Sequence, residues 1–185
     1  TRTMEEHLRY ITNIIVGADN GHLQPVYGIA LDKRLTETKV PTLGGYRGMG
    51  PVRKGNQAHE HIQNDVYGSV ILAATQAFFD ERLTRPGDPQ LFERLEAVGG
   101  RCLDLYDKPD AGLWELRTKS RVHTYSSAMC WAGVDRLAKI AERLGKSSRA
   151  AYWRDNAYRM REVILKKAFD TKQNSFVESF NGTEV

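Results

Sequence analysis

The sequence contains only two cysteines, Cys102 and Cys130, among its 185 residues. Two cysteines cannot form the framework of several disulfides that supports many small secreted domains. Each lies among apolar residues at helical spacing, so we expect both to be small buried side chains. This cysteine usage is typical of a cytosolic protein, and we expect a cytoplasmic location.

Long apolar runs and a large excess of one charge are also missing. No stretch approaches the ~18 apolar residues that a membrane-spanning helix needs, so we expect no membrane partner. Lys and Arg number 27 against 23 Asp and Glu, and the cations are scattered along the chain. Nucleic-acid-binding proteins usually concentrate their cations on one face, so we expect no nucleic acid partner either.

No repeat of fixed period is visible, which argues against TPR, HEAT and ankyrin arrays. With 41% hydrophobic and 27% charged residues, the composition is that of a globular protein. The length suits one ordinary domain.

Apolar residues recur at helical spacing in about five segments, which predicts an all-α fold. The expected helices span residues 3–17, 58–79, 88–105, 123–144 and 147–168. Asp88 before Pro89 is a typical helix start, and Gly145 is a typical residue after a helix end. Residues 175–180 alternate in the manner of a short strand.

Short turns and long loops alternate between the expected helices. The long loops cover residues 18–55 and 107–122, and the first contains enough aromatic and apolar residues to be ordered. Helices paired in this way favour an α/α toroid or solenoid, with long ordered loops on one face.

Two motifs that invite a ligand interpretation do not fit one. His59 and His61 lie two residues apart, and on a helix such side chains point apart, whereas zinc ligands on one helix are spaced i, i+4. The glycine-rich residues 44–50 lack the spacing of a phosphate-binding loop. We therefore expect neither a metal nor a cofactor.

The loop at residues 110–117 is the most informative. In it, Gly112 precedes Trp114 and Glu115. An indole packed on a carboxyl group removes it from water and favours the protonated form that a general acid needs. Alternatively, Trp114 anchors the loop and Glu115 pairs with Arg117, and the residues alone leave both interpretations open.

Four segments, taken in order, resemble the bacterial and archaeal branch of glycoside hydrolase family 15. They are residues 23–29 (LQPVYGI), 45–58 (GYRGMGPVRKGNQA), 63–68 (QNDVYG) and 110–126, which opens with DAGLWELR and ends with HTYS. The resemblance extends over residues 1–185 without large gaps. It implies an (α/α)6 barrel, a six-hairpin toroid, of which this chain is a part.

The family contains glucoamylases, glucodextranases and trehalases, which are inverting, exo-acting hydrolases of α-linked glucosides. The resemblance therefore implies an O-glycosyl hydrolase that acts on an α-glucoside oligosaccharide or on trehalose without a cofactor. Glu115 follows Trp in the family's G-[IL]-W-E motif, which implies that it is the general acid.

The resemblance also implies a glucose pocket lined by side chains that stack on the sugar or hydrogen-bond to it: Trp114, Arg117, Tyr46, Arg53, Asn56 and His123. Each has a plainer interpretation. Arg53 and Asn56 can serve only to hold their loop, Tyr46 can belong to the core, and His123 can orient Glu115 or simply pack.

Two departures from the family pattern concern the ends of the domain. An upstream Arg-Asp segment that grips the sugar is absent, and the general base is expected downstream of this chain. Glu178 and Glu184 are the only late candidates, and we assign the base role to neither. We therefore expect residues 1–185 to be a central piece of the catalytic domain, truncated at both ends. Such a piece is expected to be nearly inactive alone and to self-associate through exposed barrel edges.

A non-catalytic alternative is an interaction or regulatory module similar to regions of phosphorylase kinase regulatory subunits. The retained Trp114 and Glu115 argue against it.

Overall fold

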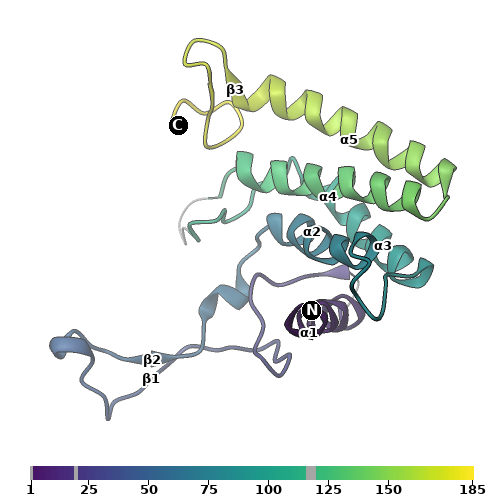
Figure 1. The fold of residues 1–185 in the computed structure, drawn as a ribbon. Coiled ribbons are helices and arrows are strands. Elements are labelled where there is room, and N and C mark those ends of the chain that lie inside the picture. The colour runs from purple at the N-terminus through teal and green to yellow at the C-terminus, as the bar shows by residue number, and fades with distance from the viewer. Residues whose placement is uncertain (1, 19–20, 116–119) are drawn as a thin grey trace. The chain divides into compact units, whose positions relative to one another are not determined.

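The computed structural model describes residues 2–18, 21–115 and 120–185 (Figure 1). The chain divides into two compact units. The larger consists of Thr1–Leu23 with Gln63–Val185, and the smaller of Gln24–Ile62.

The larger unit is built from five α-helices among the described residues, which confirms the predicted all-α class and helix number. They are α1 (Arg2–Val16), α2 (Asp65–Phe79), α3 (Pro89–Leu105), α4 (Thr124–Arg143) and α5 (Ser147–Ala168). Helix α4 packs against α2, α3 and α5, while α1 packs on α2 and α3. Figure 1 shows α4 and α5 side by side.

Local capping chemistry sets the ends of α3 and α4, as predicted. The Asp88 carboxylate accepts a hydrogen bond from the Leu91 N–H at 2.7 Å, and Pro89 opens α3. Gly145 follows the last residues of α4 with a φ of 70°, a left-handed conformation that costs glycine little.

Glycines allow α2 and α4 to approach closely. A Cβ on Gly68 would lie 1.9 Å from the Met129 carbonyl oxygen, and one on Gly133 would lie 2.9 Å from the Cα of Gly68. Gly99 likewise allows α3 to pack closely on α4, since a Cβ at Gly99 would lie 2.2 Å from the Leu137 side chain. These glycines are therefore needed for packing.

The core lies where α2, α3, α4 and α5 meet. Its largest fully buried apolar side chains are Trp153, Phe92, Ile71, Leu95, Leu137, Ile140 and Val134. Cys102 and Cys130 are buried, as expected, and neither forms a disulfide. Burial raises the pKa of the Cys102 thiol, which keeps it protonated and unreactive.

The predicted helix at 58–79 begins later than expected. Residues 57–60 form a short 3-10 helix, η3 (Gln57–Glu60), and α2 starts only at Asp65. Ile62, an apolar residue within the predicted range, is 62% exposed. The Asn56 side chain caps η3 by accepting from the Ala58 N–H at 2.9 Å, so a separate turn forms ahead of α2.

The tail forms a shorter strand than expected. β3 (Phe169–Asp170) pairs antiparallel with β4 (Ser175–Phe176). Beyond β4 the chain runs beside the residues that precede and open α4. There the Thr124 N–H donates to the Glu178 carbonyl and the Phe180 N–H to the Val122 carbonyl, both at 2.9 Å.

The smaller unit contains most of the first long loop, which is ordered as predicted. Its elements are β1 (Thr38–Lys39), the 3-10 helix η2 (Tyr46–Gly48), β2 (Arg53–Lys54) and η3. β1 and β2 pair antiparallel, and the Asn56 N–H donates to the Leu35 carbonyl at 2.7 Å.

A hollow of about 310 Å³ lies between α4, α5 and β4, and we call it the α4–α5 hollow. Most of its lining side chains are apolar: Thr124, Ala128, Trp131, Arg161, Ile164, Leu165 and Phe176. Within the part of the chain that the structure describes, no helix combines the length and apolar character needed to cross a membrane.

Candidate active site

The loop between α3 and α4 is closed at its base by a backbone pair. The Asp110 N–H donates to the Arg121 carbonyl at 2.9 Å, and the Arg121 N–H returns a bond to the Asp110 carbonyl at 3.2 Å. The base of the loop therefore has a defined geometry.

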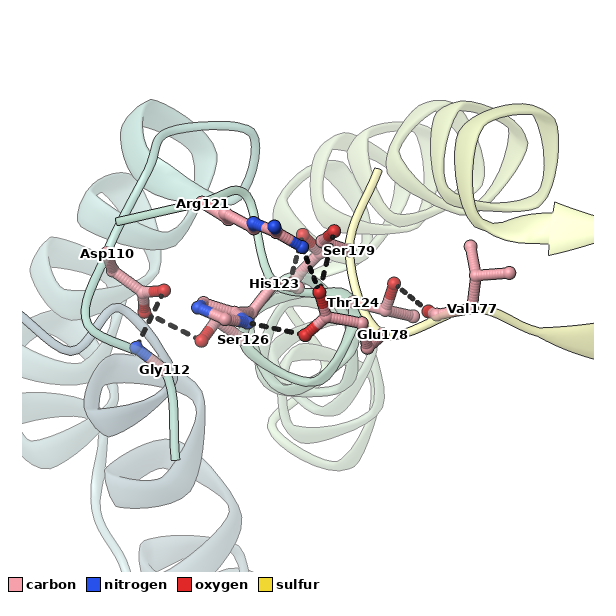
Figure 2. A network of polar contacts seen from close by, with 10 residues as sticks. Asp110, Gly112, Arg121, His123, Thr124, Ser126, Val177, Glu178 and Ser179 are labelled. Carbon is pink, nitrogen blue, oxygen red and sulfur yellow. Dashed lines mark hydrogen bonds and ion pairs between the residues drawn. The ribbon is translucent and has the colours of Figure 1, made fainter. Parts of the chain in front are cut away.

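The Asp110 carboxylate holds three elements together and is 1% exposed. Its Oδ2 accepts from the Asn64 N–H, which precedes α2, and from the Ser126 hydroxyl in α4, both at 2.7 Å. Its Oδ1 accepts from the Gly112 N–H at 3.2 Å. Figure 2 shows the bonds to Ser126 and Gly112. A buried carboxylate is stable only with such donors, so Asp110 fixes the loop relative to α2 and α4.

Glu115 lies further along this loop. Its φ of 52° is left-handed, a conformation that non-glycine residues adopt rarely. Its side chain is exposed, and its Oε1 accepts a hydrogen bond from Nε2 of Gln63 at 3.1 Å. Gln63 itself is only 7% exposed. Gln63 opens the QNDVYG segment, but its contact with Glu115, 52 positions away, cannot be read from the sequence.

Trp114 does not cover Glu115 in the way that the sequence suggested. The indole is 85% exposed and Glu115 is exposed as well, so water reaches the carboxyl group. Arg117, the predicted partner or pocket residue, lies outside the described residues.

The His123 side chain packs against the loop that carries Glu115. A Cβ on Gly112 would lie 2.6 Å from Nε2 of His123, and Gly112 has a φ of 66°. The imidazole therefore lies directly against this glycine, three residues before Glu115. On its other side, Nδ1 of His123 lies 3.9 Å from the Glu178 carboxylate (Figure 2).

Glu178 is held by structural contacts. Its carboxylate forms an ion pair with Arg121 in addition to its approach to His123 (Figure 2), and its N–H donates to the Glu184 carbonyl at 2.8 Å. Glu178 thus takes part in contacts that join the chain after β4 to the residues that precede α4.

Asp65 is a second buried carboxylate beside the loop and is 7% exposed. Its pKa is raised because burial disfavours the charged form and because Asp110 adds electrostatic repulsion. Its Oδ1 is buried without a hydrogen-bond partner among the described residues. The sequence places Asp65 in the QNDVYG segment but does not reveal this electrostatic environment.

The other predicted pocket residues belong to the smaller unit. Tyr46 is 73% exposed, which excludes the core role, and the Arg47 guanidinium lies 5.2 Å from its ring centroid. Arg53 pairs with Glu37 at 3.0 Å. Asn56 caps η3. The contacts of Arg53 and Asn56 organise their own loop.

The described residues contain no group of three or more His, Cys, Asp or Glu side chains placed to hold a metal ion. His59, considered above, places its Nδ1 2.9 Å from the Asn56 carbonyl.

An all-α frame that presents an exposed glutamate on a braced loop between helices fits the class of glycoside hydrolases. Over residues 3–184 the sequence matches the family described as glycosyl hydrolases family 15, and the chain belongs to that family.

Curated relatives of the chain carry the name trehalase. The chain is 32% identical over 175 residues to a trehalase of Mycobacterium tuberculosis, a match that covers 92% of this chain and 25% of the relative. It is 30% identical over 174 residues to a trehalase of Thermoplasma volcanium, covering 92% of this chain and 27% of that protein. Trehalase 2 of Sulfolobus acidocaldarius is 25% identical over 178 residues, which are 96% of this chain and 31% of the relative.

The chain thus spans about a quarter of the length of the first two relatives. No solved structure matches it.

Proposed function

We propose that the chain supplies the general-acid part of an inverting, exo-acting hydrolase of α-linked glucosides, with Glu115 as the acid. The observation that carries this proposal is the exposed Glu115 carboxyl group, presented by a loop that Asp110 braces, in a chain of family 15. Residues 1–185 then form part of an (α/α)6-barrel catalytic domain.

In the proposed reaction, Glu115 donates its proton to the glycosidic oxygen as the bond between that oxygen and the anomeric carbon breaks. A second carboxylate removes a proton from a water that attacks the opposite face of the sugar. Inverting enzymes hold the two carboxyl groups about 6.5–9.5 Å apart to leave room for this water. Glu178 is not assigned as the base because Arg121 occupies its carboxylate.

Trehalose is the first substrate to test, because the relatives described above are named trehalases. Maltose-type oligosaccharides, typical of glucoamylases, are the second. The exposed rings of Trp114 and Tyr46 offer flat apolar faces to a sugar. Arg53, Asn56, His123 and Arg117 are each proposed to hydrogen-bond to glucose hydroxyl groups.

The test replaces Glu115 by Gln in the full-length product of the gene. The amide keeps the shape of the side chain but has no transferable proton. General acid catalysis contributes about 10²–10⁴-fold, so we expect kcat on the disaccharide to fall at least about 10²-fold with little change in KM. The loss on α-glucosyl fluoride should be much smaller, because fluoride leaves with little protonation.

The matched control is Glu93→Gln, which changes an exposed glutamate of α3. It should leave both activities unchanged. Proton NMR of the first product should show β-glucose, as inversion requires. Near-normal turnover of the disaccharide by Glu115→Gln, or an equal loss on both substrates, would exclude Glu115 as the acid.

A further inference from the structure

Gln63 donates a side-chain hydrogen bond to the Glu115 carboxyl group. Its Nε2 donates to Oε1 of Glu115 at 3.1 Å. The two side chains differ in exposure, since Gln63 is buried at 7% whereas Glu115 is exposed. The bond therefore connects an exposed reactive group to the interior of the helical unit.

The position of Gln63 is fixed through its neighbour Asn64. The Asn64 N–H donates to Asp110 at 2.7 Å, and its side-chain amide donates to the Leu105 and Lys108 carbonyls, each at 3.2 Å. The Cys130 thiol donates to the Asn64 carbonyl at 3.1 Å. Asn64 is 1% exposed, so these bonds are shielded from water and hold the backbone next to Gln63 firmly.

The same Asp110 carboxylate also binds the Gly112 N–H. Gln63 and Glu115 thus extend from two segments that are anchored to one buried group. A donor and an acceptor held in this way form a preorganised contact, which needs little reordering when a substrate arrives.

We propose that Gln63 is a positioning residue for proton transfer. By donating to Oε1 it fixes the rotation of the Glu115 carboxyl group and leaves Oε2 to carry the proton. This inference rests on the proposed role of Glu115 as general acid. In the transfer step the proton passes from Oε2 to the glycosidic oxygen, and the amide of Gln63 keeps both of its own protons.

The experiment compares Gln63→Met with Gln76→Met in the full-length protein. Methionine matches the length of glutamine but donates no hydrogen bond. Gln76 is exposed on α2, the helix that follows Gln63, and serves as the control. Both variants are assayed on the preferred disaccharide and on α-glucosyl fluoride, with thermal unfolding to verify folding.

We expect Gln63→Met to lower kcat on the disaccharide about tenfold or more, a part of the 10²–10⁴-fold that general acids contribute. The loss on the fluoride should stay below about threefold, and KM for both substrates should change less than about twofold. A purely structural role would lower both activities alike. Gln76→Met should match the wild type.

Gln63→Asn provides a second variant if the methionine variant unfolds, because its amide is one methylene shorter and loses reach. It should show the same dependence on the leaving group. Equal losses on the two substrates, or wild-type activity on both, in a folded Gln63 variant would overturn the inference. If Glu115→Gln shows its substrate dependence and Gln63→Met does not, only the role of Gln63 fails; if Glu115→Gln lacks it, the proposed function fails as well.

Discussion

Replacing Asp110 by Asn tests whether one buried carboxylate braces the loop that carries Glu115. The amide has one acceptor oxygen in place of two. If that oxygen takes the place of Oδ2, it keeps the bonds from Asn64 and Ser126, both at 2.7 Å. The NH2 group then faces the Gly112 N–H, and the bond at 3.2 Å is lost.

The cost follows from these three bonds. A buried N–H left without an acceptor costs about 1–3 kcal/mol. The two remaining bonds lose their charge assistance, which removes roughly half the strength of each. Relief of the repulsion between Asp110 and Asp65 offsets part of this loss. We expect the free energy of unfolding to fall by about 2–3 kcal/mol, most of it the unpaired Gly112 N–H.

The assay is urea unfolding of the 185-residue chain, followed by circular dichroism. With a slope of about 2 kcal/mol/M, the midpoint should fall by about 1–1.5 M without a change in slope. The matched control is Asp104→Asn, since the Asp104 carboxylate is 67% exposed and lies 3.8 Å from Arg101; exposed pairs contribute about 0–1 kcal/mol. A midpoint for Asp110→Asn equal to that of the control would refute the bracing role.

Three other outcomes are expected. Asp65→Asn should stabilise the chain at pH 7. Because the pKa of Asp65 is raised, the folded state binds more protons than the unfolded state above pH 3.8, and the wild-type free energy of unfolding falls as the pH rises from there. The stability gained by Asp65→Asn should therefore shrink in unfolding curves measured toward pH 3.8. Gly68→Ala should destabilise by at least about 2 kcal/mol in the same assay, because its Cβ would meet the Met129 backbone, whereas Gly100→Ala, with open space around it, should not. The chain should self-associate through exposed barrel edges and bind a hydrophobic dye; a monomer in sedimentation that binds no dye would contradict this.

The sequence by itself determined the features that depend on neighbouring residues. Asp88 and Pro89 start α3, and Gly145 follows α4, because capping and left-handed turns are satisfied within a few residues of the chain. The all-α class followed from apolar periodicity in the same way. The family motif also directed attention to the loop that contains Glu115.

Only the tertiary structure decided the contacts between distant segments. The bond from Gln63 to Glu115 joins positions 52 apart, and Asp110 connects Asn64 to Ser126. Such bonds leave no periodic signal, because each depends on where helix packing places its two partners. The exposure of Trp114 was likewise decided by packing, since a sequence shows that an indole and a carboxyl group are adjacent but not whether one covers the other.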